Sequence, residues 1–114
     1  PRLLALVDVV VVPSVWDDCA PLVVAEALAA RAPVVGSRIG GIPDFVRDGE
    51  NGLLFAPGDA TDLARCLRAF ADDPGLLGRL QRGIAPPPGF GGYVDAVRAV
   101  YAEVAARAAV AAGA

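Results

Sequence analysis

The sequence predicts an α/β fold built around a short parallel sheet. Three short apolar runs of the kind found in buried strands, residues 8–13, 33–37 and 53–55, alternate with segments rich in helix formers. Strands that alternate with helices indicate βαβ units, in which consecutive strands run parallel. Apolar residues make up 55% of the 114 residues, so the chain can bury a hydrophobic core.

The first half of the chain contains two predicted strands joined by a helix. Residues 8–13, DVVVVP, form a continuous β-branched run that ends at a proline, as is typical of a strand buried on both faces. In residues 21–32, PLVVAEALAARA, the proline suits the first turn of a helix and most other residues favour helix. The second strand is expected directly afterwards, at residues 33–37.

The second half adds the third strand, at residues 53–55, and two helices. Asp59 is expected to cap the first of these helices, which has an apolar face that would pack on the sheet. That face consists of Leu63, Leu67 and Phe70. A second short helix is expected to follow at residues 74–82.

The chain divides into three predicted parts. Residues 1–83 form the α/β part, residues 84–92 form a linker rich in proline and glycine, and residues 93–114 form a last helix rich in alanine. A complete doubly wound domain normally has five or six strands, so three strands make a small sheet. We therefore predict the C-terminal half of a Rossmann-like domain, with its first strands outside this sequence.

Composition excludes several kinds of chemistry and partner. The net charge of −3 argues against nucleic acid and anionic membranes as partners, and no apolar run is long enough to span a bilayer. The chain has no histidine and no lysine, which excludes a histidine-based triad or zinc site and a P-loop lysine within it. Cys19 and Cys66 are expected to be free thiols, because we expect a cytoplasmic protein without a signal peptide.

The stretch DDCAPLVVAE, residues 17–26, places Asp18 before the predicted helix and Glu26 inside it. Glu26 is the only charged residue in about three turns, and a helix that is apolar all round is typically buried. A buried carboxylate needs a polar partner. Glu26 therefore either binds a ligand, points to solvent at a helix edge, or pairs with Arg31 or Arg38.

The start of this helix has the properties of an anion-binding site. Its first turn offers free backbone N–H groups at the C-terminal edge of a parallel strand, where open α/β sheets bind ligands. Asp18, in the preceding loop, either caps the helix or accepts hydrogen bonds from hydroxyl groups of a ligand. A phosphate at the helix start, with hydroxyl groups at Asp18 and Glu26, describes a nucleotide sugar.

Residues 13–46, PSVWDDCAPLVVAEALAARAPVVGSRIGGIPDFV, resemble the donor-binding core of family 4 glycosyltransferases, which are retaining enzymes of the two-lobed GT-B fold. The family pattern has a Pro-Ser pair, two acids with seven residues between them, a strand of small residues and a Gly-Gly-x-Pro loop. The resemblance covers about residues 3–82. The tail, residues 84–101, is similar to the helix that crosses to the other lobe.

The resemblance implies a role for each residue of the loop and helix. Asp18 stands where the family has a glutamate that contacts the transferred sugar near its reacting face, and it is one methylene shorter. The backbone amides of Cys19, Ala20 and Leu22 would hold sugar hydroxyls and the diphosphate, with Pro21 removing one N–H group. Glu26 occupies the place of the glutamate that binds the nucleotide ribose.

Other features follow from the resemblance with less detail. Gly40 and Gly41 would let their loop approach closely, and the alternative is a plain turn. No cofactor and no metal are expected, because such enzymes stabilise the leaving diphosphate with helix dipoles and basic side chains. Apart from the resemblance, Trp16 either stacks on a ligand or packs in the core, and the core is favoured for a single loop tryptophan beside a strand.

The resemblance also implies what lies outside this sequence. An N-terminal acceptor-binding lobe would be missing, so the chain alone is expected not to transfer sugar, and it could dimerise through an exposed sheet edge. The alternative is a non-catalytic module that binds a nucleotide or another protein. An epimerase or a phosphorylase of the GT-B fold is a less favoured alternative, because neither is expected to combine the Pro-Ser block with both acids at this spacing.

Overall fold

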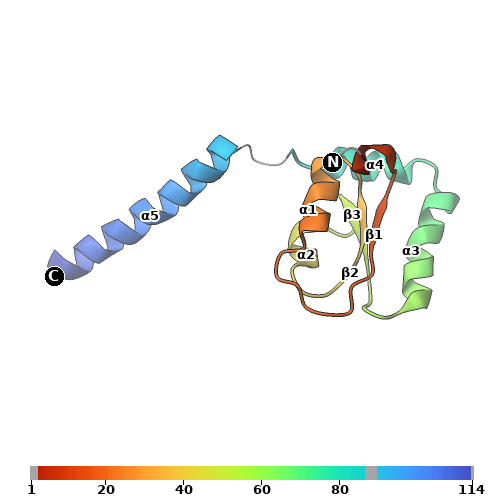
Figure 1. Ribbon diagram of the computed structural model, residues 1–114, viewed down its shortest axis with the longest axis horizontal. Helices are drawn as coiled ribbons and strands as arrows, with labels where there is room; N and C mark the ends of the chain where they lie inside the picture. Colours follow the sequence, from red (N-terminus) through yellow and green to blue (C-terminus); the bar gives the residue numbers. More distant parts are fainter. Residues whose placement is uncertain (1–2, 87–89, 114) are drawn as a thin grey trace.

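A computed structural model describes residues 3–86 and 90–113, and it contains a three-stranded sheet with helices on both faces (Figure 1). In chain order the elements are η1 (Leu4–Leu6), β1 (Val10–Val12), α1 (Leu22–Ala29), β2 (Val34–Ser37), α2 (Ile42–Phe45), β3 (Gly52–Phe55), α3 (Ala60–Asp72), α4 (Leu76–Gly83) and α5 (Phe90–Gly113). The three strands and the helices between them match the predicted segments. The predicted α/β fold is therefore confirmed.

The sheet has the order β1-β2-β3, and both strand pairs are parallel. Val10 of β1 lies beside Val34 of β2, and Val34 in turn lies beside Gly52 of β3. Helix α1 connects β1 to β2, and the short helix α2 lies in the connection from β2 to β3. The C-terminal ends of all three strands consequently meet at one edge of the sheet.

Each face of the sheet has its own hydrophobic cluster. On one face Val34 and Leu54 pack with Val24 of α1 and Ile42 of α2. The other face carries the second cluster, whose buried members are Val35, Phe55 and Cys66, and Leu63 and Phe70 of α3 pack against them. Figure 1 shows the two layers, with α1 and α2 on one side of the sheet and α3 on the other. The alternation of side chains along β2 and β3 places neighbouring residues in different clusters.

The first correction concerns α1, which is not buried on all sides. Val24 and Ala27 are buried, whereas Leu22 is 75% exposed and Glu26 is exposed as well. The helix covers the sheet with one stripe only, and no described element covers its outer side. The prediction that α1 is buried on all sides is therefore wrong. Residue type alone does not show whether a second layer covers the outer face of a helix.

Two further predictions about individual side chains are wrong. Trp16 is 67% exposed, although the core was favoured for it. Leu67 is 44% exposed, and Cys66 takes the buried place on the inner face of α3 between Leu63 and Phe70. The sheet is only three strands wide, so α3 buries a narrow stripe.

The last helix, α5, begins at Phe90, three residues before the predicted start, within the segment that we predicted to be a linker. Residues 87–89 of that linker lie outside the described residues. Val100, Tyr101 and Val104 of the predicted apolar stripe are all exposed, and Figure 1 shows α5 extending away from the sheet. No helix in the described parts of the chain has both the length and the apolar character needed to cross a membrane.

Candidate functional site

The candidate site lies at the C-terminal edge of the sheet. The loop that contains Asp18 follows β1, and the loop that contains Gly40 and Gly41 follows β2. Alpha-helix α1 begins at the same edge, so its N-terminal turn and Asp18 are neighbours in the chain and in space. Ligands of open α/β sheets bind at this edge.

Asp18 occupies an exposed turn just before α1. Its Oδ1 atom accepts a hydrogen bond of 3.0 Å from the backbone amide of Ala20, which closes a local turn. Its main-chain carbonyl oxygen accepts a second hydrogen bond, of 2.7 Å, from the amide of Gly41. The carboxylate therefore keeps one oxygen that accepts no hydrogen bond within the described part of the chain.

Gly40 and Gly41 pass directly against this turn. Gly40 has a φ of +55°, and a Cβ atom placed on it would lie 2.6 Å from the carbonyl oxygen of Asp18. A Cβ atom on Gly41 would lie 2.1 Å from the carbonyl oxygen of Cys19. Both distances are shorter than any ordinary contact. The two glycines thus permit a close approach between their own loop and the loop that contains Asp18.

The first turn of α1 keeps free backbone N–H groups. Pro21 stands at the N-cap with extended backbone, and no side chain caps the helix. The amides of Val24 and Ala25 both donate to the carbonyl oxygen of Pro21, at 3.0 and 3.4 Å. The amides of Leu22 and Val23 have no backbone acceptor in residues 3–86. These free donors at the positive end of the helix dipole can hold an anion.

Glu26 lies on the exposed side of α1, one turn after Leu22. The predicted alternative of an ion pair does not occur. The guanidinium of Arg31 instead donates to the carbonyl oxygen of Ile84 at 2.7 Å, and that of Arg38 pairs with Asp48 at 3.0 Å. The Glu26 carboxylate is therefore available to a ligand or to solvent.

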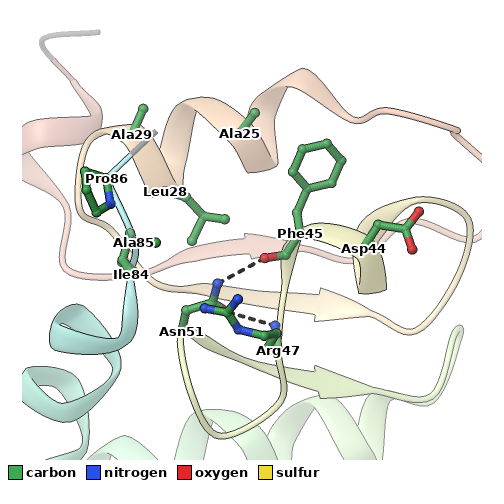
Figure 2. A pocket seen from close by; sticks show the side chains of 10 residues that line it. All are labelled: Ala25, Leu28, Ala29, Asp44, Phe45, Arg47, Asn51, Ile84, Ala85 and Pro86. Carbon is green, nitrogen blue, oxygen red and sulfur yellow. Dashed lines mark hydrogen bonds between the residues drawn. The ribbon is translucent and has the colours of Figure 1, made fainter. Parts of the chain in front are cut away.

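A hollow lies beside the C-terminal half of α1, apart from the loop that contains Asp18 (Figure 2). It has a volume of about 360 Å³ and is lined mainly by apolar side chains, among them Leu28, Phe45 and Ile84. At its base Asn51 accepts a hydrogen bond from the amide of Arg47 and donates one to the carbonyl oxygen of Phe45. The sequence does not indicate this hollow, because its residues come from separate segments and share no local pattern.

The comparisons with known proteins assign the family. Residues 1–73 match the family of glycosyl transferases group 1. The chain belongs to this family. It is 40% identical over 99 residues to the D-inositol 3-phosphate glycosyltransferase of Streptomyces bingchenggensis, covering 84% of this chain and 22% of that protein. It is 44% identical over 69 residues to the sulfoquinovosyl transferase SQD2 of Arabidopsis thaliana, covering 58% of this chain and 13% of that protein.

Solved structures share the fold of this group 1 segment. HepE of Anabaena in complex with UDP matches with a TM-score of 0.75 and 25% identity over 94% of this chain and 29% of that one. Sucrose-phosphate synthase of Thermosynechococcus elongatus matches with a TM-score of 0.65 and 34% identity over 71% of this chain and 20% of that one. The chain spans about a fifth of the curated relatives and less than a third of these structures. The predicted partial GT-B fold is therefore confirmed.

Proposed function

We propose that this chain is the donor-binding part of a retaining glycosyltransferase, which moves a sugar from a nucleoside-diphosphate sugar to an acceptor hydroxyl group. The observation that carries the proposal is the placement of two exposed carboxylates, Asp18 and Glu26, on either side of the uncapped first turn of α1. HepE of Anabaena, whose fold matches, has been solved with UDP and with UDP-glucose. Both ligands carry the diphosphate and the hydroxyl groups that this arrangement suits.

The proposed roles follow the geometry of the loop and helix. The amides of Cys19 and Leu22, with the helix dipole behind them, hold the diphosphate. Glu26 accepts hydrogen bonds from the ribose hydroxyls, and Asp18 accepts them from the transferred sugar. The amide of Ala20 is occupied by Asp18 Oδ1 in this structure. It becomes available to the donor when the Asp18 carboxylate turns toward the sugar.

In the proposed reaction the bond between the sugar C1 atom and the diphosphate oxygen breaks, and the acceptor oxygen takes its place on the same face of the sugar. The acceptor hydroxyl gives its proton to the diphosphate oxygen released from C1, and the nucleoside diphosphate departs. Asp18 stabilises the positive charge that develops on the sugar, while the free amides stabilise the leaving diphosphate. We propose that no divalent metal takes part, so an excess of EDTA should leave the rate unchanged.

The test uses the complete polypeptide that contains these residues, with UDP-glucose and other nucleotide sugars as donors. Asp18→Asn should lower kcat on the order of 100-fold, because it removes charge stabilisation near the reacting carbon. Glu26→Gln should weaken donor binding by about tenfold or more with a smaller effect on kcat, because it removes hydrogen bonds to a charged acceptor. NMR of the product should show the anomeric configuration of the donor.

Asp72→Asn is a matched control, because Asp72 is an exposed acid at the far end of α3. It should leave both constants unchanged. The proposal fails if Asp18→Asn and Glu26→Gln behave like this control, or if no nucleotide sugar binds. The 114-residue chain alone should bind donor weakly and transfer no sugar, because the acceptor-binding lobe is not part of it.

A further inference from the structure

A single hydrogen bond joins the loop that presents Asp18 to another segment of the described chain. Residues 14–20 form no regular helix or strand, and their side chains are half-buried or exposed. Among the described residues, the hydrogen bond from the Gly41 amide to the Asp18 carbonyl oxygen, at 2.7 Å, is the one that joins this loop to another segment. The other hydrogen bond of the loop, from Ala20 to Asp18, is internal.

We propose that Gly41 is a positioning residue for Asp18, an inference that rests on the proposed function. Gly41 has a φ of −80° and a ψ of −1°, a conformation open to any residue, so backbone freedom does not explain a glycine here. The reason is space. A Cβ atom would lie 2.1 Å from the carbonyl oxygen of Cys19 and 3.2 Å from that of Asp18.

Gly40 lies against the same turn. A Cβ atom on Gly40 would lie 2.6 Å from the carbonyl oxygen of Asp18 and 2.8 Å from its amide nitrogen. The main chain of Asp18 therefore lies too close to Gly40 and Gly41 for either residue to carry a side chain without a shift. Gly40 and Gly41 lie only a few residues after the end of the buried strand β2, so that strand fixes the position of Asp18.

This arrangement makes the position of the carboxylate depend on a residue that need not touch the donor. A side chain at Gly41 must push the Asp18 turn outward, break the hydrogen bond, or both. A displacement of about 1 Å at a reacting centre can lower the rate on the order of 100-fold. A side chain at Gly41 is therefore expected to lower the contribution of Asp18 to the rate and to leave the fold of the sheet intact.

The experiment is a double-mutant cycle in the complete polypeptide with UDP-glucose as the probe. Gly41→Ala should lower kcat/KM on the order of 100-fold. Combined with Asp18→Asn, it should lower kcat/KM little further than Asp18→Asn alone, because both changes remove the same contribution of the Asp18 carboxylate. Gly49→Ala is the matched control. Gly49 has a φ of +77° with open space around it, so this variant introduces backbone strain without displacing Asp18.

Each outcome supports or overturns the proposal. The proposal is overturned if the fold-loss of kcat/KM in the double variant equals the product of the two single fold-losses. An unchanged kcat/KM in Gly41→Ala would overturn it as well. If Asp18→Asn itself has no effect, the proposed function of Asp18 fails, which is a different result. A measurement on the unmodified protein covers the case in which Gly41→Ala does not fold. The Gly41 amide should exchange slowly with deuterium without donor present, and fast exchange would overturn the proposal.

Discussion

Asp48 closes one edge of the sheet by accepting, through Oδ1, a hydrogen bond of 2.9 Å from the backbone amide of Leu54. Leu54 belongs to β3, and its amide points away from β2. The carbonyl oxygen of Leu54 accepts a weak hydrogen bond from Cys66 Sγ, and that of Gly52 accepts one from the amide of Gly49. These three groups of β3, which would pair with a further strand, are thus already bonded.

The opposite edge, at β1, is open. The amide of Val10 donates to the carbonyl oxygen of Pro33, so alternate residues of β1 pair with β2. Val9 and Val11 consequently direct their N–H and C=O groups outward, and Val11 is 40% exposed. No strand lies beside this edge in the part of the chain that the structure describes. Any further strand of a longer polypeptide would extend the sheet here.

Self-association through β1 is the first prediction. The 114-residue chain should associate as its concentration rises, because an unpaired strand edge binds another copy. Val11→Lys should reduce the association and Asp48→Ala, which frees the Leu54 amide, should increase it. Sedimentation velocity measures both effects. A wild-type chain that stays monomeric at high concentration would contradict the prediction.

Asp59 caps α3, and removing the cap should destabilise the chain. Its Oδ1 atom accepts hydrogen bonds from the amides of Thr61 and Asp62 at 2.9 and 3.0 Å. Asp59→Ala should lower the free energy of unfolding by about 1 kcal/mol, as measured by urea denaturation. Asp59→Asn is the control, because asparagine caps helices about as well. Equal losses in the two variants would show that the charge, and not the cap, matters.

Arg31 combines backbone strain with a useful hydrogen bond. It follows the C-cap residue of α1 and has a φ of +66°. Beside it the amide of Ala32 donates to the carbonyl oxygen of Ala27, and the Arg31 guanidinium donates to the carbonyl oxygen of Ile84. Arg31→Ala loses that hydrogen bond and keeps the strain, while Arg31→Gly loses the bond and relieves the strain. The glycine variant should be the more stable of the two by about 1 kcal/mol. The reverse order of unfolding midpoints would refute this account.

The two cysteines should differ in reactivity. Cys19 is exposed in the Asp18 loop, whereas Cys66 is buried against the sheet and its burial raises the pKa of its thiol. A thiol reagent should therefore modify Cys19 in the native chain and Cys66 only after unfolding. Under the proposed function, UDP-glucose should slow the modification of Cys19 in the complete polypeptide. Modification of Cys66 in the native chain at the same rate as Cys19 would contradict the structure.

Stability should fall in acid because of two aspartates. The guanidinium of Arg79 and the amide of Gly75 lower the pKa of Asp73, and the amide of Ala56 and the guanidinium of Arg65 lower the pKa of Asp62. The unfolded chain then binds protons at a higher pH, so this stabilisation is present above the ordinary aspartate value of 3.8 and is lost as the pH falls through the lowered values.

Asp73→Asn tests this dependence. Urea midpoints measured from neutral pH down to strong acid should fall less steeply for Asp73→Asn than for the unmodified chain, and the two should converge at the lowest pH. Asp72→Asn is the control, because its exposed side chain accepts no hydrogen bond within residues 3–86. A variant that keeps the original pH dependence would exclude Asp73 as a cause.

Local sequence predicted most of the fold. The β-branched run before Pro13 and the small-residue run after Pro33 are strands, and Asp59 caps its helix. Each of these outcomes depends on residues within one turn or one strand of each other. The order of Pro-Ser pair, acids and Gly-Gly loop also indicated the family that the comparisons show.

The sequence by itself determined the elements, their order and the two acids of the candidate site, because periodicity, capping and spacing are local properties. Only the tertiary structure decided what surrounds them. It left Trp16 and the outer face of α1 exposed, and it closed the β3 edge with Asp48. It also brought Gly41 against Asp18 across 22 intervening residues. Such contacts depend on which loops meet at a sheet edge, and the residues of one loop do not indicate which other loop it will contact.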